Sequence, residues 1–159
     1  MTPLHLIDDM AAWLRPVLQS YEVHGATGDT KPVSVYTYYA DIPDAYDASP
    51  REPYVLLRPL EGTDDWDEST AKCAIVVAVR DEDGKDGYVQ TMNLLEHIRQ
   101  HLLTSAAVAN KYPIKRPIQW GIDNEPNIPV YMGYITVEVN IGHLDNAGAI
   151  PFLLGEEDS

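Results

Sequence analysis

Two histidines on a stretch with helical periodicity, His97 and His101, have the four-residue spacing of a pair of zinc ligands. The zinc-protease motif with this spacing needs a glutamate directly after the first histidine, and Ile98 occupies that position. No third ligand is evident in the sequence. We therefore expect two ordinary, partly exposed histidines and no metal site.

The loop Asp81–Gly87, with the sequence DEDGKDG, is similar in composition to a calcium-binding loop. An EF-hand loop needs glycine at its sixth position and glutamate at its twelfth. Counted from Asp81, those positions hold Asp86 and Met92. The loop is instead expected to be a solvated turn in which Asp86 caps the following helix.

The other residues capable of chemistry do not form a recognisable catalytic pattern. Cys73 lies in an apolar run, which is typical of a small buried hydrophobe rather than of a reactive thiol. The carboxylates fall in loops or on polar faces, whereas acid–base catalysis needs two of them in contrasting environments within a cleft. Nucleophile-elbow and glycine-rich phosphate-loop motifs are missing, although a Ser/His/Asp arrangement stays open. We expect no enzymatic activity, no catalytic residues and no cofactor.

The charge balance narrows the classes of partner. The chain has 159 residues, 45% of them apolar, and a net charge of −14 from 25 acidic and 11 basic residues. This excess of negative charge disfavours sequence-specific nucleic-acid binding and docking on anionic membranes. No apolar run approaches the roughly 20 residues of a membrane helix. Asp8 and Asp9 interrupt the first apolar stretch, so no signal peptide is expected. We therefore expect the protein to be made in the cytoplasm.

Hydrophobic periodicity predicts two helices and about five strands. An N-terminal helix has the apolar stripe Leu4, Ile7, Ala11, Leu14 and Leu18, and a second helix has the stripe Leu94, Leu95, Ile98 and Leu102. The strands are expected at 33–39, 54–60, 71–80, 113–121 and 131–141. The third is apolar on both faces and should be central, and Pro59 places a bulge or an edge near the end of the second.

The expected fold class is therefore α+β. One domain, residues 1–144, should contain a mainly antiparallel or mixed sheet with both helices packed on it. Residues 145–159 form a C-terminal tail with an apolar patch at Ile150, Phe152, Leu153 and Leu154. The patch either packs back on the domain or docks on a neighbouring molecule.

Two acidic loops and one basic cluster are the candidate contacts with other subunits or partners. Tyr46 and Trp66 lie in the acidic loops 41–53 and 64–68, where a large aromatic is either a lid over the core or an anchor for a partner. The basic cluster consists of Lys111, Lys115 and Arg116. It could pair with a neighbour's acidic loop, or could simply be a solvated edge that discourages strand pairing. The candidate residues are Asp44, Tyr46, Asp47, Arg51, Trp66, Lys111, Lys115, Arg116 and Phe152.

The order of these elements resembles the tail terminator (tail completion) family of long-tailed bacteriophages, typified by the lambda tail terminator. The resemblance covers roughly residues 3–142. It consists of an N-terminal amphipathic helix, the strands YVLLRPLEG and AKCAIVVAVRDEDG, the helix YVQTMNLLEHIRQHLL, and the closing strands YPIKRPIQW and PVYMGYITVEVNI. The extended loop 41–53 and the C-terminal tail depart from the family pattern.

The resemblance implies a structural protein of the virion, located at the head-proximal end of the tail. Such proteins form a ring, commonly a hexamer, that caps the tail tube, ends its polymerisation and offers a surface to the head–neck connector. The expected partners are other copies of the chain, the tail tube protein and the connector protein. A closed ring needs two different surfaces that meet, and the acidic loops and the cluster Lys111, Lys115 and Arg116 are candidates for them. A head–tail connector or neck subunit is the nearest alternative. A small acidic enzyme or ligand-binding protein is the alternative from a different class.

Overall fold

The computed structural model describes residues 2–19, 21–24, 30–38, 52–125 and 128–142 of the chain. Two helices and eight strands are formed by these residues. The helices are α1 (Pro3–Gln19) and α2 (Gly84–Thr104). The strands are β1 (Glu22–His24), β2 (Thr30–Pro32), β3 (Ser34–Thr37), β4 (Tyr54–Asp64), β5 (Ser69–Arg80), β6 (Ala107–Val108), β7 (Tyr112–Ile122) and β8 (Val130–Asn140).

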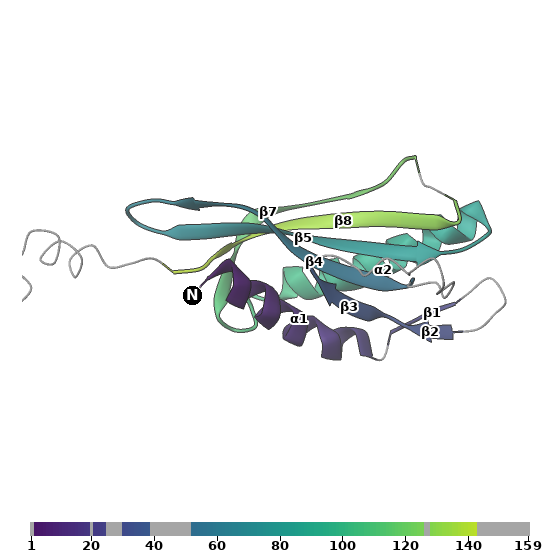
Figure 1. Cartoon of the computed structure of the whole chain (residues 1–159), viewed down its shortest axis with the longest axis horizontal. Coiled ribbons are helices and arrows are strands. Elements are labelled where there is room, and N and C mark those ends of the chain that lie inside the picture. Colours follow the sequence, from purple (N-terminus) through teal and green to yellow (C-terminus); the bar gives the residue numbers. More distant parts are fainter. Residues whose placement is uncertain (1, 20, 25–29, 39–51, 126–127, 143–159) are drawn as a thin grey trace, which may run out of the picture.

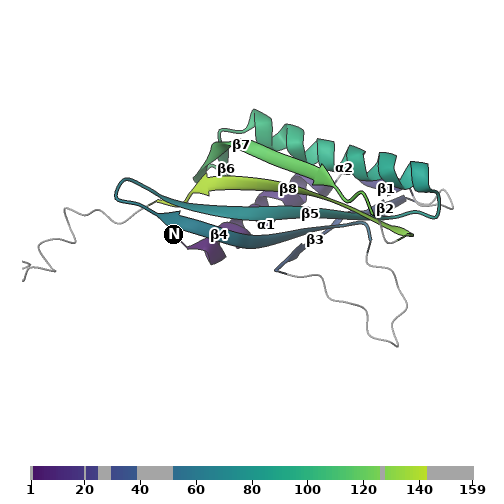
Figure 2. The same cartoon turned by 90° about the horizontal axis from the view of Figure 1, so that it is seen from above.

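Six of the strands form one mixed sheet in the order β3-β4-β5-β8-β7-β6, and β1 and β2 form a separate two-stranded hairpin. All neighbours in the large sheet are antiparallel except β3 and β4, which are parallel. Figures 1 and 2 show the sheet with β5 and β8 running through its middle. The predicted α+β class is confirmed, and β5, predicted from its two apolar faces to be central, lies between β4 and β8.

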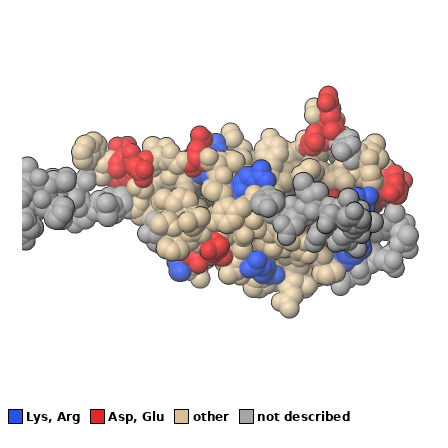
Figure 3. All heavy atoms as spheres, in the orientation of Figure 1, with Lys and Arg blue, Asp and Glu red and all other residues tan. Residues whose placement is uncertain are grey.

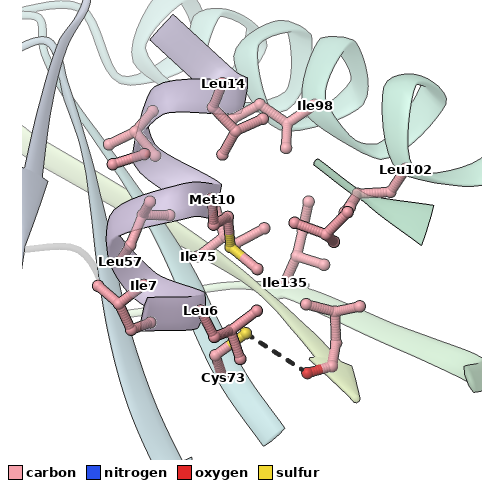
Figure 4. Close-up of a cluster of buried hydrophobic side chains, with 14 of the residues drawn as sticks. Leu6, Ile7, Met10, Leu14, Leu57, Cys73, Ile75, Ile98, Leu102 and Ile135 are labelled. Atoms are coloured by element: carbon pink, nitrogen blue, oxygen red, sulfur yellow. Dashed lines mark hydrogen bonds between the residues drawn. The ribbon is translucent and has the colours of Figure 1, made fainter. Parts of the chain in front are cut away.

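The core fills the concave face of the curved sheet. Alternate residues of β8 point into it, and Ile135, Val137 and Val139 are fully buried there. Side chains of α1 and α2 pack against this concave face, as Figure 4 shows for Leu14 of α1 and Ile98 of α2. Cys73 is one of the buried core residues, and its thiol donates a 3.6 Å hydrogen bond to the carbonyl of Val137. Burial raises the pKa of this thiol to about 12, as expected for a structural cysteine.

The six-stranded sheet is curled into a half-barrel, and α1 lies across its open side. This helix contacts β3 and β4 near one edge of the sheet and β6 at the other, whereas α2 covers β5 and β8. The buried stripe of α1 comprises Leu6, Ile7, Met10, Ala11, Leu14 and Leu18. Leu4, which the sequence pattern placed in the stripe, is 61% exposed because it lies on the first turn, before the helix meets the sheet.

The five predicted strands are all present, with different ends. The strand predicted at 54–60 continues to Asp64, and its register shifts between Pro59 and Glu61, so the bulge predicted from Pro59 is confirmed. The short strands β1, β2 and β6 were not predicted. They have two or three residues each, too few for a period-two pattern to be recognised.

The start of α2 corrects one sequence-based prediction. Asp83, not Asp86, is the N-cap: its carboxylate accepts hydrogen bonds from the backbone amides of Lys85 and Asp86, at 2.9 and 3.1 Å. The backbone of Asp83 is extended, as an N-cap requires, whereas Asp86 already lies in the first turn. The loop has carboxylates at both positions, so the sequence alone did not decide between them.

The packing of α2 on β8 depends on a glycine. A Cβ at Gly87 would overlap the buried ring of Tyr131, whereas one at Gly84 would lie 3.4 Å from the Oη of that residue. We expect Gly87→Ala to destabilise the protein by about 1–3 kcal/mol because the core is overpacked. Gly84→Ala, the matched control, should change the free energy of unfolding by less than about 0.5 kcal/mol. Urea denaturation measures both, and equal effects would contradict the packing explanation.

Candidate functional site

The hairpin formed by β4 and β5 extends beyond the two helices. Every residue of β4 from Arg58 to Asp64 is exposed, whereas Val55, Leu56 and Leu57 just before them are buried. Figures 1 and 2 both show the end of this hairpin reaching past the N-terminus of α1. We call residues 58–68 the arm. Since β3 pairs with β4 only from Tyr54 to Leu57, the arm is paired along one edge, with β5, among the described strands.

The tip of the arm presents a tryptophan between carboxylates. Trp66 is 77% exposed and Leu60, further back on the arm, is 50% exposed. The turn is closed by a 2.8 Å hydrogen bond from the amide of Asp65 to the carbonyl of Glu68, and the carboxylate of Asp65 accepts the amide of Trp66 at 2.7 Å. Figure 3 shows acidic side chains gathered at this end of the molecule. The predicted turn around Trp66 is therefore present, and the indole is displayed outward instead of covering the core.

The turn at the end of the arm is held by a polar network. Lys115 on β7 pairs with Glu68, and its Nζ also lies 3.9 Å from a carboxylate oxygen of Glu138 on β8. The amide of Asn140 donates to Glu68 at 3.3 Å. The hydrogen bond with Glu68 raises the pKa of the Lys115 ammonium. A predicted basic contact and a predicted acidic loop thus meet within one chain, at the turn that ends the arm.

The other two basic candidates turn to different partners. Lys111 Nζ lies 3.4 Å from Asp9 Oδ2 on α1, and this oxygen also accepts a 2.6 Å hydrogen bond from the phenol of Tyr112. Arg116 donates at 3.2 Å to the carbonyl of Leu103, near the C-terminus of α2. Successive residues of a strand point to opposite faces, which separates Arg116 from Lys115. The three cations therefore do not share one set of partners.

The remaining predicted contacts lie outside the described residues. They are Asp44, Tyr46, Asp47 and Arg51 in the loop 41–53, and Phe152 in the C-terminal tail. Their roles stay predictions.

A groove that the sequence did not reveal runs along α1. Its volume is about 680 Å³, and it lies between the outward face of α1 and the segment that joins β2 to β3. Ala12, Arg15, Pro16 and Gln19 line one wall and residues 32–35 the other. The helical spacing of the first wall is visible in the sequence, but the segment opposite it is brought there by the fold.

A second hollow, of about 470 Å³, lies near the end of the sheet where β7 and β8 meet. Its lining includes Val76, Asp123 and Tyr134. Tyr134 is 45% exposed, and its ring lies over Gly121, where an added Cβ would come within 2.6 Å of the Tyr134 Oη. The arrangement pairs an aromatic with a glycine across two strands and brings no set of acid–base groups together.

The two histidines pack against α1. His97 Nε2 lies 3.0 Å from the carbonyl oxygen of Val17, and the ring of His101 packs against that of Trp13 with the ring centroids 4.4 Å apart and the planes tilted by 40°. Burial, followed by the charge of His97, lowers the pKa of His101. Within the described ranges, no three His, Cys, Asp or Glu side chains are placed to hold a metal ion together.

A buried carboxylate at the start of α2 is also engaged. Asp81 is 3% exposed and accepts hydrogen bonds from the amide of Asp83, at 2.8 Å, and from the side chain of Gln90. These contacts tie the end of β5 to the first turns of α2.

None of the helices in the described ranges is long and apolar enough to cross a bilayer.

In comparisons with known proteins, no family model and no curated protein matches this chain.

The contact between α1 and β7 predicts a pH dependence of stability. Hydrogen bonding by Tyr112 lowers the pKa of Asp9, so this contribution is present above the unfolded value of about 3.9 and is lost as the pH falls through the folded pKa. Burial raises the pKa of Tyr112 to about 12, so its contribution is present below about pH 10 and is lost between about pH 10 and 12.

Tyr112→Phe removes this hydrogen bond, and the loss at pH 7 should be about 0.5–1 kcal/mol because solvent screens the Asp9 carboxylate. The difference from the parent protein should shrink both below pH 4 and above pH 10. Denaturant unfolding across this range measures it, with Lys111→Gln as the control that keeps the phenol. A difference that does not vary with pH would contradict the assignment.

The network that holds the turn of the arm predicts an effect confined to the arm. Lys115→Glu would place a third carboxylate beside Glu68 and Glu138, and backbone amide exchange in residues 58–68 should accelerate roughly three- to tenfold. Lys115→Gln should have a smaller effect because it removes a cation without adding repulsion. Arg116→Glu, which alters a cation directed to α2 instead, should leave exchange in the arm unchanged. Hydrogen exchange followed by mass spectrometry resolves the three cases.

Proposed function

We propose that this chain is a structural subunit of a long-tailed bacteriophage, a tail terminator that assembles into a ring on the end of the tail tube. In this role it ends polymerisation of the tube protein and offers a surface to the head–neck connector. Its place is the head-proximal end of the tail in the virion. The role needs no catalytic group and no cofactor.

The observation that carries the proposal is the arm. In a protein that acts alone, an exposed indole at the end of a polar hairpin brings no benefit, because an exposed apolar side chain is a liability for solubility. Trp66 at 77% exposure and Leu60 at 50% therefore favour a protein whose arm is covered after assembly. Tryptophan is among the residues that contribute most to binding at protein interfaces.

Two further features support the same role. The helix–strand–helix–strand order expected from the family resemblance is the order of the main elements in the fold. The net charge of −14 suits a ring through which DNA passes, because an acidic lumen repels the phosphate backbone and does not retain it.

Light scattering coupled to size exclusion, over a range of protein and salt concentrations, tests the proposal. A hexamer would have six times the 17.7 kDa mass of the chain, and we expect a discrete ring-sized species whose share grows with protein concentration. When the chain is added to tubes assembled from the cognate tail tube protein, electron microscopy should then show tubes with capped ends and uniform length. Tubes that grow unchanged, with the chain bound to connector protein instead, would assign it to the neck.

A further inference from the structure

The arm tip has charges that the described part of the chain does not pair. Asp64, Asp65 and Asp67 flank Trp66, and none of them forms an ion pair with another described residue. By contrast Glu61, further back on β4, pairs with Lys72, and Glu68, at the end of the turn, pairs with Lys115. Among the described residues, the tip therefore has an apolar ring beside three carboxylates without an ion-pair partner, in a turn that Lys115 and Asn140 hold through Glu68.

The groove along α1 has the opposite character. Its walls are mostly apolar, from Ala12, Pro16, Pro32 and Val33 among others, and the one charged side chain in its lining is Arg15. Lys31 is exposed directly beside this lining, before Pro32. Neither Arg15 nor Lys31 forms an ion pair with a carboxylate of the described chain. On a protein with 25 acidic and 11 basic residues, two such cations beside an apolar groove are a distinctive feature.

We propose that the arm of one copy of this chain docks into the α1 groove of the next copy. Trp66 would lie against the apolar walls, and Asp64, Asp65 and Asp67 would face Arg15 and Lys31. The inference rests on the proposed ring function and names the surfaces that join its subunits. A groove of about 680 Å³ is within the range of sizes that bind a whole small ligand, so it is large enough for an indole.

The geometry favours a second copy over the chain's own arm. The arm ends beyond the N-terminus of α1, whereas the groove residues of this helix, Ala12 to Gln19, belong to its C-terminal half (Figures 1 and 2). An arm whose end turn is held through Glu68 by Lys115 and Asn140 cannot turn back to that half. Because the two surfaces are different, the contact is head-to-tail, and such contacts close into a ring when the rotation between neighbours allows it.

The two kinds of interaction have different consequences. The buried indole supplies most of the affinity, since tryptophan in a desolvated pocket is the commonest kind of interface hot spot. The charges around it steer and orient the encounter, so raising the salt concentration should slow association more than dissociation.

A mixing experiment tests the contact. The arm variant Trp66→Ala retains an intact groove, and the groove variant Arg15→Glu retains an intact arm. Each variant alone should assemble at least roughly 30-fold more weakly than the parent. For Trp66→Ala, a loss of this size is typical of truncating an interface hot spot. An equimolar mixture should form a complex of two chains and nothing larger, because the one intact arm occupies the one intact groove. Analytical ultracentrifugation distinguishes these masses.

Matched controls separate the contact from general effects. Trp120→Ala removes a second exposed tryptophan, 48% exposed on β7, and Lys85→Glu reverses an exposed cation at the start of α2. Both should assemble as the parent does. Asp65→Lys combined with Arg15→Glu in one chain should recover part of the lost assembly, because the charges are exchanged across the interface. Circular dichroism checks that all variants are folded.

The outcomes are distinguishable. A parent ring that survives both Trp66→Ala and Arg15→Glu overturns the arm-in-groove contact and leaves the ring proposal standing. Loss of assembly in both variants with no two-chain complex in the mixture also overturns it, because the substitutions then act at separate contacts. A parent that stays monomeric at every concentration, with the tube present or absent, overturns the contact and the ring together.

Discussion

The burial of one stripe of α1 is the interaction on which the curved sheet depends. The concave face of β4, β5 and β8 is lined by fully buried Val, Ile and Leu side chains, and α2 covers only its centre. Leu6, Ile7, Met10 and Leu14 fill the remaining space and contact strands near both edges, so the helix holds a mixed sheet in its half-barrel form. Burial contributes about 25 cal/mol per Å² of apolar surface, or about 1.5–3 kcal/mol for each fully buried Leu or Ile side chain, more than the roughly 0–1 kcal/mol of a typical surface ion pair.

The arm is a consequence of unequal lengths. The 11 residues of β4 span about 36 Å, whereas the 17 residues of α1 span about 26 Å. Where the helices end, one half of the hairpin loses its packing partners while the other half stays paired with β8. The strand continues because its hydrogen bonds to β5 are local. Its side chains then face solvent on β4, and their identity is free to serve contacts outside the chain.

Electrostatics divide the surface in a way that the composition alone does not reveal. The three cations expected to form one basic patch are used inside the molecule, at α1, at the turn of the arm and at the end of α2. Among the described charges without an ion-pair partner, Asp64, Asp65 and Asp67 lie at the tip of the arm, and Arg15 and Lys31 lie beside the α1 groove. Subunit contacts proposed for this protein therefore use different cations from those that stood out along the sequence.

The sequence by itself determined the elements whose signal is local. The helical stripes, the alternation in β8, the two apolar faces of β5, the bulge at Pro59 and the turn around Trp66 all follow from spacing and residue type over a few positions. The tertiary structure alone decided the parallel pairing of β3 with β4, the choice of Asp83 as N-cap, the pairing of Lys115 with Glu68, and the groove opposite Arg15. Each of these joins residues distant in the chain or selects among similar neighbours. Such choices are determined by the free energy of packing between distant parts of the chain. A short window of sequence carries no information about that packing.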